Sequence, residues 1–220
     1  DHSSPAITFF LLEEKKEATG YFDLHLKAYS IFTQFLMSFK NEVGINITPE
    51  KLSFCFLRPL FFGDTKSRSL ITALFSFILE DKTYERHIRL RSSNGGSIEP
   101  FINHLFKGSR ILESLLNLQA KGSDLKDLVI KLPILEINTQ LFKGDKRSFQ
   151  SAINTYAALT TQKISHSNRD FAVSYIVRNL AGHSLIWSDE FKKVNNYLQL
   201  AKCIRSSILW SIHKLWINPT

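Results

Sequence analysis

The feature that most limits the possible folds is the regular spacing of apolar residues in the last third of the chain. Between Phe191 and Leu215 these residues recur at steps of three and four, which places them on one face of a helix. Asp189 and Glu190 come just before, and the helix dipole favours carboxylates in a first turn. The apolar face is formed by Phe191, Val194, Leu198, Ala201, Ile204, Ile208, Ile212 and Leu215. Such a helix needs other helices to pack against, so the pattern predicts a helical bundle.

The same spacing predicts helices earlier in the chain, at residues 21–43, 70–78, 100–106 and 149–159. Gly44 is the expected end of the first, and Pro100 suits the first turn of the third. Ser123 and Asp124 are expected to cap a short helix that Pro133 ends. The overall fold class is therefore predicted to be mainly α.

Three segments leave alternatives open. Ile7 to Leu12 is a short apolar run that suits a strand or the start of a helix. Leu52 to Phe62 is rich in phenylalanine but is broken by Arg58-Pro59, and it suits a strand or a buried turn. Residues after Gly108 either continue the preceding helix or begin a new one. The N-terminal part is accordingly predicted to be a Phe-rich α or α+β region.

The clearest loop is Ser-Ser-Asn-Gly-Gly-Ser at residues 92–97. An internal boundary is expected there, which divides the chain into residues 1–95, of unknown role, and a helical domain at residues 96–220. The N-terminal part matches no sensor domain that can be identified by sequence. A regulatory or substrate-delivering role is one hypothesis for it.

The amino-acid composition excludes several classes of protein. Apolar residues make up 44% of the chain and charged residues 22%, which is enough apolar material to form a core and excludes general disorder. Lys or Arg interrupts every long apolar run, so no membrane-spanning segment is predicted. The net charge of +8 favours an anionic partner, nucleic acid first, although ordinary surface charge is the alternative. The basic residues concentrate at Lys82, Arg86, His87, Arg89 and Arg91.

The two cysteines, Cys55 and Cys203, lie far apart among apolar neighbours. Two buried thiols in a reducing cytoplasm are expected, with a single disulfide as the alternative. No signal peptide is predicted, which agrees with a cytoplasmic location. Because the chain begins at Asp1 rather than at methionine, it is expected to be a processed product or an excised fragment.

Common catalytic motifs are missing from the sequence. There is no Cys-x-x-Cys and no His-Glu-x-x-His, and Asp23 and His25 would point to different sides of a helix. Glycine-rich phosphate loops, dinucleotide fingerprints and the Gly-x-Ser-x-Gly elbow are also missing. No metal and no cofactor is therefore expected.

The remaining motif is Arg178-Asn179-Leu180-Ala181-Gly182-His183, at the end of an apolar helix. Ser167 to Asp170 has the spacing of a capping box that would open this helix, and Gly182 would close it. An arginine followed by a polar residue, with histidine five positions on, resembles the R-x4-6-H motif of the HEPN superfamily. The resemblance covers roughly residues 148–215 and includes the helices before and after the motif.

The resemblance implies a small helical-bundle ribonuclease that works without a metal, in a toxin-like or antiviral defence role. His183 would be the general acid or base, because imidazole titrates near neutral pH. Arg178 would stabilise charge on the phosphoryl oxygens, and Asn179 would orient a phosphate or the histidine. The implied products are a 2′,3′-cyclic phosphate and a 5′-hydroxyl.

One copy of the motif supplies one arginine and one histidine. Five residues of regular helix span about 500°, so the two side chains would lie about 140° apart unless Gly182 ends the helix and turns His183 back. The resemblance implies that two protomers join their motifs in one composite cleft, so a homodimer is expected, with RNA as substrate. A regulatory domain or antitoxin is a further possible partner. In the alternative interpretation the domain is a catalytically inactive adaptor or nucleic-acid-binding dimerisation module. A structural role for Arg178 is a separate alternative, in which it caps the carbonyls at the end of its helix or pairs with Ser174 and Asp170.

Overall fold

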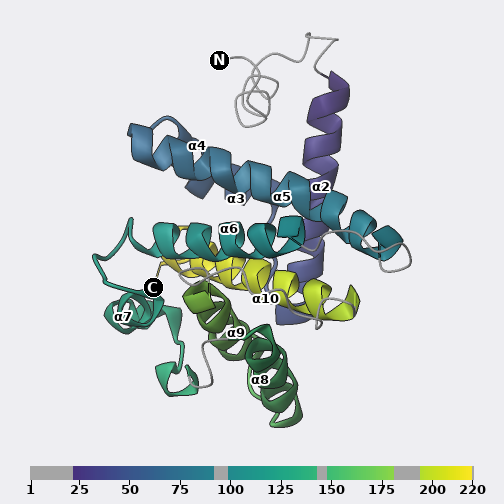
Figure 1. The fold of residues 1–220 in the computed structure, drawn as a ribbon. Coiled ribbons are helices and arrows are strands. Elements are labelled where there is room, and N and C mark those ends of the chain that lie inside the picture. Colours follow the sequence, from purple (N-terminus) through teal and green to yellow (C-terminus); the bar gives the residue numbers. More distant parts are fainter. Residues whose placement is uncertain (1–21, 92–98, 143–147, 181–193, 220) are drawn as a thin grey trace. The chain divides into compact units, whose positions relative to one another are not determined.

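The computed structural model describes residues 22–91, 99–142, 148–180 and 194–219 (Figure 1). Every regular element within these ranges is helical, so the prediction of a mainly α fold is confirmed. The segment at Ile7–Leu12 lies outside the described residues.

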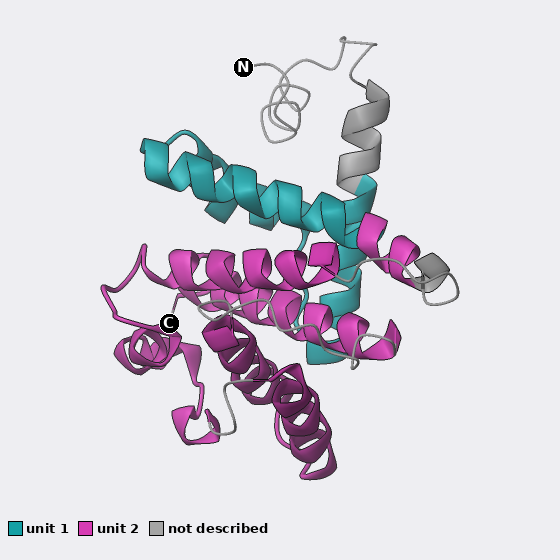
Figure 2. Cartoon of the chain, in the orientation of Figure 1, with its two compact units in different colours: residues 1–82 teal, residues 83–220 magenta. Residues whose placement is uncertain are grey.

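The chain divides into two compact units, residues 1–82 and residues 83–220 (Figure 2). The division falls within one long helix, α5 (Thr65–Arg91). The boundary predicted at residues 95 and 96 lies outside the described part of the chain.

The first unit contains α2 (Phe22–Val43), three short helical segments and the first two thirds of α5. The helix predicted at residues 21–43 is confirmed by α2, which ends before Gly44. Gly44 has a φ angle of +79°, which glycine adopts without strain, and its amide donates to the carbonyl of Lys40 at 2.9 Å. Phenylalanines fill the core of this unit; the rings of Phe32 and Phe75, for example, lie 4.8 Å apart.

The segment from Leu52 to Phe62 is helical, so both interpretations offered for it, strand and buried turn, are wrong. It consists of α3 (Pro49–Leu52), a π-helical turn η1 (Ser53–Leu57) and α4 (Arg58–Phe61). The wider π turn directly precedes Pro59, whose ring would clash with an earlier carbonyl in a regular α-helix. The helix thus accommodates a proline that would otherwise end it.

The second unit is a helical bundle. It contains α6 (Glu99–Leu116), α7 (Leu125–Lys131), α8 (Phe149–Thr161), α9 (His166–Leu180) and α10 (Val194–Ile212). Short helical turns lie at Pro133–Leu135 (η2), Thr139–Leu141 (η3) and His213–Ile217 (η5). The helix α10 packs against α6, α9 and α8, and its apolar face is buried in the core (Figure 1). The helix α6 continues through Gly108, which settles the alternative left open there.

The beginning of α9 differs from the prediction. The helix begins at His166, two residues before the expected start, and the Arg169 amide bonds to the Ser165 carbonyl. Ser167 and Asp170 are therefore both inside the helix and both buried. The capping box predicted at Ser167–Asp170 is wrong, because the carboxylate that it assigned to a helix end faces the core instead.

The cap of α7 is as predicted, and it can be tested. The Asp124 carboxylate accepts a hydrogen bond from the Asp127 amide at 2.8 Å. We expect Asp124→Ala to lower the free energy of unfolding by about 1 kcal/mol, because an orphan amide at the helix start loses its acceptor. Urea denaturation followed by circular dichroism measures this loss. Asp124→Asn, which keeps a side-chain oxygen, is the matched control; an equal loss in both variants would contradict the cap assignment.

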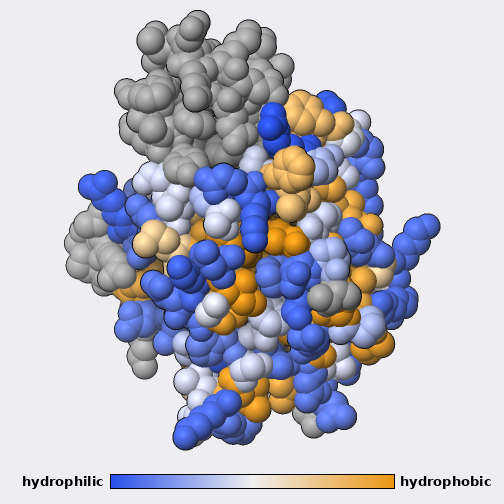
Figure 3. All heavy atoms as spheres, turned by 180° about the vertical axis from the view of Figure 1, so that it is seen from behind, coloured by the Kyte–Doolittle hydropathy of each residue, from blue (hydrophilic) through white to orange (hydrophobic). Residues whose placement is uncertain are grey.

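Within the described ranges, no helix has the length and apolar character needed to cross a membrane. Hydrophilic residues predominate on the face drawn in Figure 3, with hydrophobic residues in dispersed patches.

Candidate functional site

Arg178 lies in the last turn of α9, where it meets a carboxylate from another helix. Its guanidinium Nε donates to Glu113 Oε2 of α6, and the two groups form an ion pair. The side chains are largely buried, with 28% of Arg178 and 14% of Glu113 exposed to solvent. The alternative partners are engaged elsewhere: Ser174 Oγ lies 3.1 Å from Ser207 Oγ, and Asp170 pairs with Arg169. The alternative in which Arg178 pairs with Ser174 and Asp170 is therefore not what the structure shows.

Glu113 is the only described residue that pairs with Arg178, and the contact is made at Nε. A guanidinium carries five donors in a planar fork, so one carboxylate leaves donors on the outer edge of the fork available. That edge has the geometry for a bidentate contact with a phosphate or a carboxylate.

Asn179, next in the chain, also has an unused donor. Its side chain is half-buried, and its Nδ2 is shielded from solvent without a hydrogen-bond partner among the described residues. A buried amide nitrogen without an acceptor costs free energy, so this group has capacity for a ligand atom or a neighbouring side chain. His183 and Gly182 lie outside the described residues, so of the three predicted site residues the structure describes Arg178 and Asn179, which are consecutive in the last turn of α9.

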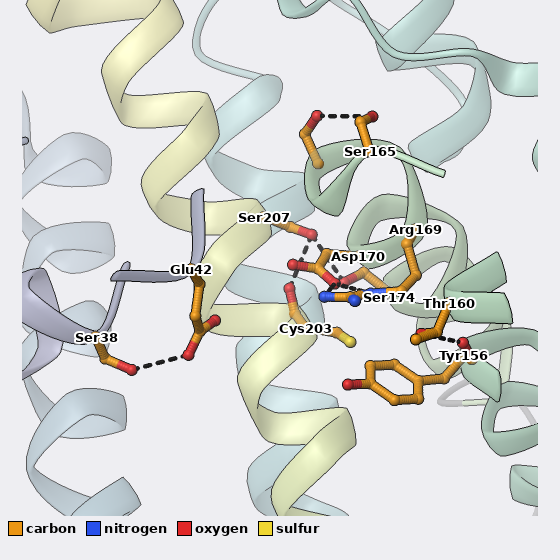
Figure 4. Close-up of polar contacts among 11 residues, drawn as sticks. Ser38, Glu42, Tyr156, Thr160, Ser165, Arg169, Asp170, Ser174, Cys203 and Ser207 are labelled. Atoms are coloured by element: carbon orange, nitrogen blue, oxygen red, sulfur yellow. Dashed lines mark hydrogen bonds and ion pairs between the residues drawn. The ribbon is translucent and has the colours of Figure 1, made fainter. Parts of the chain in front are cut away.

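More than two turns earlier, α9 carries a buried ion pair. Arg169 Nη2 lies 2.8 Å from Asp170 Oδ1, Nε donates to the same oxygen at 2.9 Å, and the guanidinium stacks over Tyr156 at 4.7 Å from the ring centroid (Figure 4). Arg169 is 6% exposed and Asp170 is fully buried. Substrate cannot reach these groups, so the pair has a structural rather than a catalytic role.

Burial dominates the electrostatics of this cluster. It raises the pKa of Asp170 although the charge of Arg169 opposes the shift. Burial also opposes the charge of Arg169, but attraction to Asp170 outweighs it and raises the pKa of the guanidinium. The pKa of Cys203 is raised well above its usual value by burial and by the nearby carboxylate, which keeps the thiol neutral and unreactive.

A second buried polar contact joins α6 to α10. The Tyr197 hydroxyl and His104 Nδ1 lie 2.9 Å apart, and the ring of Tyr84 packs edge-on to the imidazole at 5.0 Å. His104 is 2% exposed, so it cannot serve as a general base for a large substrate. It holds α6 against α10.

Several tryptophan, histidine and basic residues outside the motif were also located in the structure. Trp210 donates from Nε1 to the Leu135 carbonyl at 2.8 Å and so anchors the core. His166 is exposed at the beginning of α9. The basic side chains of Lys82, Arg86 and His87 are exposed along α5. Residues outside the described ranges include Trp187, Lys192 and Lys193.

Both cysteines are free thiols, as predicted, but only Cys203 is fully buried, whereas Cys55 is half-buried. No group of three or more metal-ligating side chains occurs in the described segments.

Sequence reasoning missed Glu113. Beyond the first turn it is the one carboxylate in α6, and it interrupts the apolar run Ile-Leu-Glu-Ser-Leu-Leu. An acid beside a run of buried residues is a signal for a buried partner, but the sequence does not say which cation pairs with it. No family model, no curated protein and no solved structure matches this chain.

Proposed function

We propose that the chain is a metal-independent endoribonuclease of HEPN type. The observation that supports this most directly is the state of Arg178: Glu113 holds it at Nε, and no other described residue pairs with it. An arginine that is fixed in place and still has donors to spare suits recognition of a phosphodiester. Asn179, one residue away, has a buried amide nitrogen without a hydrogen-bond partner among the described residues.

In this proposal the ribose 2′-oxygen attacks the adjacent phosphorus, and the bond from phosphorus to the 5′-oxygen breaks. His183 takes the 2′-hydroxyl proton or protonates the leaving 5′-oxygen. Arg178 stabilises the charge that develops on the phosphoryl oxygens, and Asn179 orients the phosphate or the imidazole. The products are a 2′,3′-cyclic phosphate and a 5′-hydroxyl, so the cleavage step consumes no water.

A homodimer is part of the proposal, since one motif supplies a single arginine and a single histidine. Two motifs facing each other across a two-fold axis would supply two cations and two proton-transfer groups for one phosphodiester. The net charge of +8 suits RNA as the partner. The proposal includes a toxin-like or antiviral defence role in the cytoplasm.

RNA incubated with the protein in excess EDTA tests the proposal. We expect cleavage to continue, because neither nucleophile nor stabilising charge comes from a metal, and end-group analysis is expected to find cyclic phosphate termini. His183→Ala, purified in the same way, is the control against a contaminating nuclease and is expected to lose the activity. Loss of cleavage in EDTA, or equal cleavage by His183→Ala, would contradict the mechanism.

The ion pair itself favours one alternative, a catalytically inactive adaptor or nucleic-acid-binding module. A guanidinium paired with a largely buried carboxylate also suits a purely structural link between α6 and α9. RNA binding by wild type without cleavage, and with unchanged affinity in His183→Ala, would favour this alternative.

A further inference from the structure

Glu113 occupies an unusual place for a carboxylate. It follows Leu112 on α6, a residue with no exposed surface, and it lies where α6 packs against α9. A carboxylate that is 14% exposed is costly unless it is paired, and Arg178 is its partner in the described structure. The pair therefore links a side chain from a long, rigid helix to the arginine of the R-x4-H motif.

The atom at which Glu113 contacts Arg178 determines which guanidinium donors remain available to a ligand. Because Glu113 accepts from Nε, it restricts the plane of the guanidinium and its direction, and one carboxylate cannot occupy all five of its donors. A free arginine side chain has many rotamers, and a site that must bind a transition state gains when those rotamers are already restricted. The same contact lowers the net positive charge at this place, so any benefit to catalysis comes from geometry and not from added charge.

We propose that Glu113 is a positioning residue, which orients Arg178 so that its terminal amino groups face the scissile phosphate. This inference rests on the proposed ribonuclease function. It adds a residue 65 positions away in sequence to a site otherwise defined by the motif alone.

Two conservative substitutions of Glu113 distinguish a role in positioning Arg178 from a role as a counter-charge alone. Glu113→Gln removes the charge but keeps an acceptor oxygen at the same reach. Glu113→Asp keeps the charge but is one methylene shorter, so the guanidinium must move to keep the contact. For a positioning residue, the aspartate variant is expected to be the slower one, by about tenfold in the single-turnover rate constant for RNA cleavage, with melting temperatures that differ little.

Glu136→Gln is the matched control, because it removes a carboxylate that pairs with Lys214 at 2.7 Å elsewhere in the same unit. It is expected to cleave RNA at the wild-type rate. A glutamine variant slower than the aspartate variant, or both variants as fast as wild type, would overturn the positioning role while wild-type cleavage upholds the ribonuclease. No cleavage by wild type would overturn the ribonuclease and the positioning role together.

Discussion

Replacing Arg178 with alanine is expected to lower the rate constant for RNA cleavage about 100-fold to 1,000-fold, the range typical of losing one preorganised donor to a transition-state anion. The physical reason is that one carboxylate leaves some of the five guanidinium donors over, and these donors are available to the phosphoryl oxygens. The Michaelis constant should rise much less, because the interaction strengthens only as charge develops. Single-turnover kinetics at saturating protein measure the effect.

Arg178→Lys is the informative comparison. Lysine keeps the charge but lacks both the Nε donor that Glu113 holds and the planar fork, so we expect it to recover little of the rate. The double variant Arg178→Ala with His183→Ala should be hardly slower than the worse single variant, since the two groups act in one step. Full activity in Arg178→Lys would mean that only the charge matters, and this would contradict bidentate phosphate binding.

The largest expected effect on stability comes from Asp170. We expect Asp170→Ala to lower the free energy of unfolding by about 3–5 kcal/mol, because it leaves the Arg169 guanidinium buried without a counter-charge. Chemical denaturation at neutral pH, with the midpoint and slope both recorded, measures this loss.

A double substitution that removes both charges shows which effect destabilises Asp170→Ala: the burial of an unpaired cation or the loss of side-chain packing. Arg169→Met with Asp170→Leu is expected to be markedly more stable than Asp170→Ala, because neither buried charge remains. Glu136→Gln, which breaks an exposed ion pair with Lys214, should change stability by about 1 kcal/mol or less. An Asp170→Ala variant as stable as Glu136→Gln would show that Arg169 finds water or another partner in the folded state.

The spacing of apolar residues was sufficient to predict the fold class. A helix that buries one face needs apolar residues at every third or fourth position, and this requirement is visible directly in the sequence. The helix at residues 21–43, its end at Gly44 and the cap at Asp124 are all confirmed. The failures occurred where a local rule competes with a tertiary contact. Arg58-Pro59 indicated a break, but a π turn accommodates the ring, and Ser167–Asp170 had cap spacing although Asp170 pairs inside the core.

The site was less predictable than the fold. Arg178 and Asn179 are found together at the end of α9, but their partners come from distant parts of the chain. Glu113 and His104 both lie on α6, and a spacing pattern cannot show which residues on another helix will face them. The site assignments to Arg178, Asn179 and His183 remain predictions that the kinetic experiments above will test.

The packing of α10 against α6 has a consequence for how the protein is made. A ribosome completes α6 long before it begins α10, yet α10 is the helix that covers α6 and supplies Tyr197 to the buried His104. Until then the nascent chain exposes residues such as Leu105 and Leu112, which are fully buried in the finished bundle. Folding of this unit therefore waits until α10 has been synthesised, and chaperones that bind apolar helices have that interval in which to act.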